Sequence, residues 1–162
     1  VHIYSEGGKK KVSFYSRNLE NTTEMFPDLA EAASKIKVSS AIFDAEAIGF
    51  DPKTGRFLPF QETVQRKRKH DIEEMIKKLP LRLFVFDILY KDGKSYIETP
   101  FGERRKILEK TLSEVNDKIE ITRQEIVDAA QVIRTLQKEY LTEGLEGAMI
   151  KKIDAQLSMR EY

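Results

Sequence analysis

Two acidic residues, Asp44 and Glu46, stand in a stretch of otherwise small and apolar residues. If this stretch is a β-strand, Asp44 and Glu46 share one face of it with Ile48, because side chains alternate between the two faces. Two carboxylates on one face indicate either a polar cleft or an edge strand with one solvated face, and the residues alone favour neither. Carboxylates in a cleft bind divalent metal ions, as phosphoryl-type transfer requires.

Three further positions carry side chains suited to the same chemistry. Phe86 precedes Asp87 in a second apolar run. It is either an ordinary core residue or an aromatic platform for a base, a role for which Phe84 on the same strand face competes. Arg17 follows a predicted strand, and Glu146 lies in a Glu-Gly pair before a short hydrophobic run. Taken singly, these last two are typical of a surface arginine and a turn.

The chain has two clusters of basic residues, although its formal net charge is only +1. They are Lys9-Lys10-Lys11 and Arg66-Lys67-Arg68-Lys69-His70. A short charge run is most often a solvated face, and the lysine triplet fits that interpretation. The second cluster is longer and contains arginine, whose guanidinium makes paired hydrogen bonds to phosphate. It is therefore predicted to contact nucleic acid.

Length and composition exclude several classes of protein. The 162 residues are enough for one domain with a buried core. The absence of cysteine excludes disulfides and thiolate metal sites within this sequence, and its two histidines have no metal-site spacing. No signal peptide or membrane-spanning apolar run is present, so we expect an intracellular protein (cytoplasm, nucleoid or nucleus) that does not contact a membrane.

The periodicity of the sequence predicts which elements position these side chains. Strands are expected at residues 1–4, 11–16, 40–50, 81–90, 118–121 and 148–153, and helices at 23–37, 61–78 and directly after Thr99-Pro100. Residues 6–9 and 91–94 are typical of hairpin turns. Residues 122–125 form a capping box that predicts one more helix, with its apolar face at Ile126, Ala129, Ala130, Ile133, Leu136, Tyr140 and Leu141. Hairpins favour an α+β fold with mostly antiparallel sheets flanked by helices.

Five short motifs, taken in order, indicate a family. They are Ser16-Arg17-Asn18-Leu19-Glu20-Asn21, Phe43-Asp44-Ala45-Glu46-Ala47, Pro59-Phe60-Gln61, Leu83-Phe84-Val85-Phe86-Asp87-Ile88-Leu89-Tyr90 and Glu146-Gly147-Ala148-Met149-Ile150-Lys151. This succession resembles the adenylation domain of ATP-dependent DNA ligases of the archaeal and eukaryotic replicative type. The resemblance spans nearly the whole sequence and implies an ATP-grasp-like nucleotidyltransferase fold.

The resemblance implies a role for each candidate residue. Arg17 would contact the nucleotide and the phosphate at a nick. Glu46 would hydrogen-bond the ribose and Phe86 would stack on the adenine. Glu146 would bind the catalytic metal, so the implied cofactors are ATP and Mg²⁺. The residues that would contact DNA are Arg17, Arg66, Lys67, Arg68 and Lys69.

The nucleophilic lysine of this family belongs to a Lys-x-Asp-Gly motif, which the sequence lacks. Val1-His2-Ile3-Tyr4 resembles the strand that directly follows that motif, so the nucleophile is expected just before Val1 and the family's terminal lysine motif after Tyr162. Residues 1–162 are interpreted as a single adenylation-domain fragment, inactive by itself, with no OB-fold and no separate DNA-binding domain.

The whole enzyme is expected to form ligase-AMP, pass AMP to the 5′-phosphate at a nick and seal the nick. We expect a monomer that binds nicked duplex DNA, with a sliding clamp as a further partner through regions outside this sequence. Two alternatives stay open: an RNA ligase or capping-type nucleotidyltransferase, and a non-catalytic nucleic-acid-binding module of the same fold. The second basic cluster and Phe26-Pro27-Asp28 argue against the first, and the joint presence of all four candidate site residues argues against the second.

Overall fold

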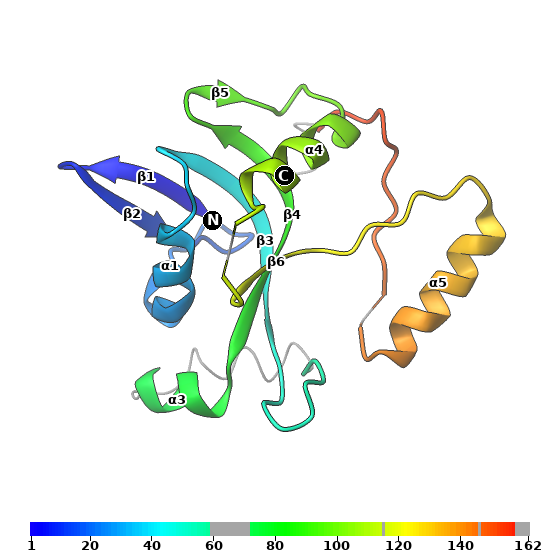
Figure 1. Cartoon of the computed structure of the whole chain (residues 1–162), viewed down its shortest axis with the longest axis horizontal. Coiled ribbons are helices and arrows are strands. Elements are labelled where there is room, and N and C mark those ends of the chain that lie inside the picture. The colour runs from blue at the N-terminus through cyan, green and yellow to red at the C-terminus, as the bar shows by residue number, and fades with distance from the viewer. Residues whose placement is uncertain (59–71, 115, 146, 158–162) are drawn as a thin grey trace.

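The computed structural model describes residues 1–58, 72–114, 116–145 and 147–157. Among these residues, the strands form a six-stranded sheet in the order β2-β1-β3-β4-β5, with β6 paired to β4 (Figure 1). The strands are β1 (His2–Glu6), β2 (Lys9–Ser13), β3 (Ala41–Gly49), β4 (Leu81–Lys91), β5 (Lys94–Ser95) and β6 (Ile119–Ile121). All pairs are antiparallel except β4 with β6. The predicted α+β class with mainly antiparallel strands is confirmed.

Both predicted hairpins are present. Gly7 and Gly8 join β1 to β2 with φ angles of 58° and 75°, as a two-residue turn with the twist of a hairpin requires. The turn between β4 and β5 contains Asp92, whose Oδ1 accepts hydrogen bonds from the backbone N–H of Ser39 and Ser40. This turn is thereby fastened to the start of β3.

β3 and β4 form a long antiparallel pair at the centre of the sheet. The pair runs from Ala41 opposite Lys91 to Gly49 opposite Leu81. The other edge of β4 pairs with β5 and β6, so β4 is central, as its near-continuous apolar run predicts.

The helix predicted at residues 23–37 is two elements. A 3₁₀ helix, η1 (Thr23–Met25), precedes α1 (Pro27–Ser34). Pro27 opens α1 because its missing N–H and fixed φ suit the first turn. Asn21, just before η1, accepts hydrogen bonds from the backbone N–H and the hydroxyl of Thr23.

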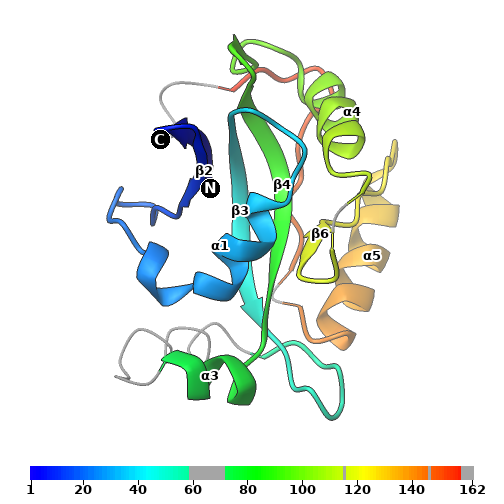
Figure 2. The same ribbon diagram turned by 60° about the vertical axis from the view of Figure 1, so that its left-hand side comes forward.

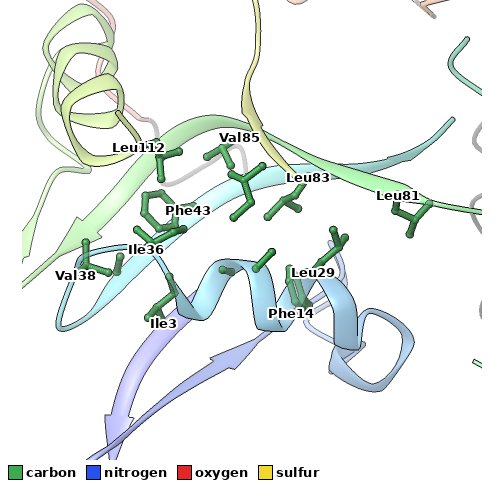
Figure 3. Close-up of a cluster of buried hydrophobic side chains, with 14 of the residues drawn as sticks. Ile3, Phe14, Leu29, Ile36, Val38, Phe43, Leu81, Leu83, Val85 and Leu112 are labelled. Atoms are coloured by element: carbon green, nitrogen blue, oxygen red, sulfur yellow. The ribbon is translucent and has the colours of Figure 1, made fainter. Parts of the chain in front are cut away.

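The main core lies between α1 and one face of β3 and β4 (Figure 3). The helix contributes Leu29, Ala32 and Ala33, all buried. The strand residues of this core are Ala41, Phe43, Leu81, Leu83, Val85 and Ile88. α4 (Phe101–Thr111) adds Leu108, and α3 (Ile72–Lys78) adds Met75. Burial of each large apolar side chain stabilises the fold by about 1.5–3 kcal/mol relative to exposure.

The capping-box prediction was wrong. Residues 122–129 form no helix, and α5 (Ala130–Thr142) begins at Ala130. The backbone of Thr122 is already engaged, because its N–H donates to Val85 O and its carbonyl accepts from Arg105. Thr122 therefore continues the contact of β6 with β4 and cannot cap a helix. Among the residues of the predicted apolar face, only Tyr140 is buried.

The strand predicted at residues 148–153 is also absent from the described part of the chain. β3 pairs along one edge of β4, and on the other edge β6 pairs with residues 83–85 and β5 with residues 90 and 91. Figures 1 and 2 show residues 148–153 instead on the side of β3 and β4 opposite to α1.

Of the helix predicted at residues 61–78, only the part from Ile72 lies within the described residues, where it is confirmed as α3. None of the helices in those residues is both long enough and apolar enough to span a bilayer.

Candidate functional site

Pairing of β3 with β4 brings two of the predicted site strands side by side. Glu46 lies opposite Phe84, and Asp44 lies opposite Asp87. The side chain of Glu46 is exposed and that of Asp44 is partly buried. An exposed carboxylate thus lies beside an aromatic side chain on the neighbouring strand.

A β-bulge distinguishes Phe86 from Phe84. Val85 pairs with Ala45 and Asp87 pairs with Asp44, so Phe86 is an extra residue with no partner on β3. A bulge bends its strand and re-aims the side chain it carries. Phe86 is half-buried.

Phe84, by contrast, is only 8% exposed and packs edge-on against Phe57, with ring centroids 5.4 Å apart. Phe84 therefore has the environment of a core residue, and Phe86 has the more accessible ring.

Lys151 approaches Phe86 from the far end of the chain. Its Nζ lies 5.7 Å from the centroid of the Phe86 ring and 5.0 Å from that of Phe101 at the start of α4. The same atom lies 3.8 Å from Oδ2 of Asp87. A cation at this distance from a ring face is attracted by the quadrupole of the ring. The ammonium group therefore sits between two aromatic rings and a carboxylate.

Asp87 also forms a buried ion pair with Arg104. The guanidinium donates from Nε to Oδ1 at 2.8 Å and from Nη2 to Oδ2 at 2.7 Å, and its Nη1 donates to the carbonyl of Thr99. The side chains of Asp87 and Arg104 are only 1% and 2% exposed. Such a paired arrangement satisfies the desolvated guanidinium and fixes its orientation. α4 is thus tied to β4 at the residue that follows Phe86.

Arg17 is exposed in the turn that follows β2. The turn is braced by its neighbours, since the N–H of Ser16 donates to Glu20 O and the N–H of Glu20 donates to Ser16 Oγ. Leu19 in this turn has a φ of 61°, which is unusual for a bulky residue, and is 80% exposed. The ring of Tyr15, just before the turn, lies 4.8 Å from that of His2.

The histidine at the start of β1 is affected by burial. Burial lowers the pKa of His2 in the folded chain. His2 therefore loses its charge more readily when the chain is folded.

Some of the predicted site residues lie outside the described residues. They are Glu146, Arg66, Lys67, Arg68 and Lys69, and the Pro59-Phe60-Gln61 motif lies outside them too. Within residues 1–58, 72–114, 116–145 and 147–157, no group of three or more His, Asp or Glu side chains could hold a metal ion.

The sequence predicts neither a site role for Arg104 nor its buried ion pair with Asp87. One signal was available: a carboxylate in a buried apolar strand requires a cationic partner. Nothing local identifies Arg104 rather than Arg105 as that partner, because the choice depends on which side of α4 meets β4.

Comparison with known families shows what kind of domain carries this site. The family model described as "ATP dependent DNA ligase domain" matches residues 2–161. The chain belongs to this family. The resemblance inferred from the five motifs is thereby confirmed.

Several DNA ligases are similar to this chain in sequence. The "Probable DNA ligase" of Dictyoglomus thermophilum is 46% identical over 157 residues, which are 95% of this chain and 27% of the relative. The "DNA ligase" of Nanoarchaeum equitans is 39% identical over 157 residues, which are 96% of this chain and 27% of the relative. The chain thus spans about a quarter of the length of these relatives.

Solved structures of DNA ligases share the fold. The mycobacterial DNA ligase D complexed with ATP and MES has a TM-score of 0.69 and 23% identity, covering 97% of this chain and 46% of that chain. At this identity the likeness concerns the fold alone. This likeness confirms the nucleotidyltransferase fold that the sequence predicts.

Proposed function

We propose that this chain is the nucleotide-binding part of an ATP-dependent DNA ligase. The whole enzyme would transfer AMP from ATP to its own lysine and then to the 5′-phosphate at a nick in duplex DNA, and would seal the nick with the 3′-hydroxyl. The observation that carries the proposal is the family match over residues 2–161.

The geometry on β3 and β4 fits an adenine nucleotide. Phe86 is half-buried, so one part of its ring is available for stacking, whereas Phe84 is packed against Phe57. Base stacking on an aromatic ring contributes on the order of 1–3 kcal/mol. The exposed carboxylate of Glu46 on the neighbouring strand is an acceptor for ribose hydroxyls. These side chains support Phe86 as the adenine platform and Glu46 as the ribose contact.

The described residues also fit Mg²⁺. This ion keeps several waters and is usually bound by one or two carboxylates together with phosphate oxygens of the substrate, so a dedicated cluster of protein ligands is not required. Asp44 on β3 is a carboxylate of this kind, and we propose Glu146 as a further ligand. When bound, Mg²⁺ would neutralise charge on the phosphates during AMP transfer.

Nicked duplex DNA is the proposed substrate of the whole enzyme. The exposed Arg17 has a guanidinium available for phosphate, which is recognised by paired hydrogen bonds. Contacts from Arg66, Lys67, Arg68 and Lys69 remain a proposal, as do a monomeric state and a sliding-clamp partner.

Titration of ATP with Mg²⁺ into the chain tests the nucleotide site. We expect Phe86→Ala to weaken ATP binding by about 5- to 150-fold, the equivalent of one lost stacking contact. Glu46→Gln should mainly reduce discrimination between ATP and 2′-deoxy-ATP. Glu31→Gln is the matched control, because Glu31 is an exposed carboxylate on α1, on the other side of the sheet. Equal affinities for all of these variants would contradict the assignment.

The covalent step is tested separately. The 162 residues contain no Lys-x-Asp-Gly motif, so labelled ATP should leave no covalent AMP on this chain in a denaturing gel. In the ligase that carries the chain, Glu146→Gln should raise the Mg²⁺ concentration needed for adenylation, whereas Glu46→Gln should not. A stoichiometric label on the 162-residue chain would refute the proposal that the nucleophile lies outside it.

A further inference from the structure

Residues 147–157, called the strap below, are attached to the start of α4 through backbone hydrogen bonds. The N–H of Phe101 donates to Ala155 O and the N–H of Gly102 donates to Ile153 O, both at 2.8 Å. The first N–H groups of a helix have no acceptor within the helix. Here the strap supplies those acceptors, so the helix start and the strap are complementary.

Gly102 forms a notch that accepts Ile153. A Cβ atom at position 102 would lie only 2.7 Å from Cγ2 of Ile153. Carbon atoms do not approach this closely without displacement of one of them. With Ile153 in its present rotamer, the strap follows this path because residue 102 has no side chain.

The buried ion pair extends the same attachment to β4. Asp87 receives two hydrogen bonds from Arg104 of α4, and its Oδ2 lies 3.8 Å from Nζ of Lys151 in the strap. One carboxylate thus faces both the helix and the strap. It follows Phe86 directly, and Lys151 lies over the Phe86 ring.

Away from these contacts, the N–H of Leu157 donates to Ile97 O at the end of the strap, whereas Met149 and Ile150 are 83% and 67% exposed. The path of the strap near Lys151 therefore depends on the attachment at α4 and Asp87, and we expect an added methyl group at the notch to weaken it.

We propose that Gly102 and Arg104 are positioning residues that seat the strap on α4 and so hold Lys151 beside the Phe86 ring. Nucleotide binding at Phe86 then requires the seated strap. The part of this inference that concerns nucleotide binding rests on the proposed function. The seating of the strap on α4 does not depend on it.

The test uses a compensating pair of substitutions. Gly102→Ala introduces the clash with Ile153 and leaves the ion pair unchanged, whereas Ile153→Ala removes the clashing Cγ2. The variants to compare are Gly102→Ala, Ile153→Ala and the double variant. Hydrogen exchange of the residue 101 and 102 amides, resolved by NMR, reports the seated fraction, because these amides have no helical acceptor. Exchange of the β3 and β4 amides reports the integrity of the fold. ATP affinity is measured on the same samples.

If the strap is seated only a fraction of the time, the apparent dissociation constant of ATP rises by the inverse of that fraction. We expect Gly102→Ala to speed exchange of both amides about tenfold or more, and to weaken ATP binding by the same factor as the seated fraction falls. The double variant should restore both. Arg104→Lys keeps the charge but loses the paired hydrogen bonds. Its ATP affinity should likewise fall by the same factor as its seated fraction.

Unchanged exchange at residues 101 and 102 in Gly102→Ala would overturn the seating. Complete loss of protection at residues 101 and 102 with unchanged ATP affinity would overturn the dependence of the nucleotide site on the strap, because the seated fraction itself would then have fallen. Failure of the unaltered chain to bind ATP would overturn the proposed nucleotide site and that dependence together, and the exchange data would still decide the seating.

Discussion

Replacement of Arg104 by methionine should strongly destabilise the folded chain. The change keeps much of the side-chain volume but removes the partner of Asp87, which is 1% exposed. Among the described residues, the carboxylate then keeps the N–H of Ile88 at 2.9 Å and the more distant Lys151. Loss of one member of a buried ion pair costs about 3–5 kcal/mol, because the other charge stays desolvated. Movement of Lys151 towards Asp87 would place the cost near the lower end of that range.

This loss is a large part of the stability of a domain, which is about 5–15 kcal/mol. For a chain of this size it corresponds to a fall in melting temperature of about 6–20 °C. Urea unfolding followed by circular dichroism measures the free energy directly. Asp87→Leu in combination with Arg104→Met removes both charges, and should recover most of the loss. Lys110→Met, on an exposed position of the same helix, should change stability by no more than about 0.5 kcal/mol.

Two results would refute this reasoning. A cost below about 1 kcal/mol for Arg104→Met would mean that the pair is solvated or unformed in solution. A double variant that loses at least as much stability as the two single variants together would mean that the cost arises from packing, because removal of both charges would then give no recovery.

Three more outcomes are expected. Phe84→Ala should lower the unfolding free energy by about 3–5 kcal/mol and weaken ATP binding less than Phe86→Ala does, whereas Phe86→Ala should mainly weaken ATP binding. Thermal melting and ATP titration measure the two effects. A larger loss of affinity in Phe84→Ala at an unchanged melting temperature would contradict the assignment of Phe86 as the platform. Leu19→Asn should raise stability by about 1 kcal/mol, because asparagine tolerates positive φ better than leucine; a loss of stability in urea unfolding would argue against the strain. The unfolding free energy should rise as the pH increases towards 6.5, the ordinary pKa of histidine, because burial lowers the pKa of His2 in the folded chain and the unfolded chain therefore binds more protons. Urea unfolding at several pH values would contradict this if stability were flat or falling.

The sequence by itself determined the α+β class, both hairpins and the strands other than the one predicted at residues 148–153. These features follow from local patterns, such as the apolar run of β4 and the Gly7-Gly8 turn, and local patterns do not depend on distant partners. The order of motifs also identified the family. Local signals failed at Thr122, where pairing with Val85 O prevailed over a well-formed capping box.

The tertiary structure alone decided how the parts of the site meet. The bulge that gives Phe86 a different environment from Phe84 forms only when β3 and β4 pair in their observed register. The partner of Asp87 is Arg104 rather than Arg105, and Lys151 reaches Phe86 from a distant segment, because packing of α4 sets their positions. Periodicity specifies which residues share a face of one element, but contact between elements depends on how their surfaces fit together, which is a property of the whole fold.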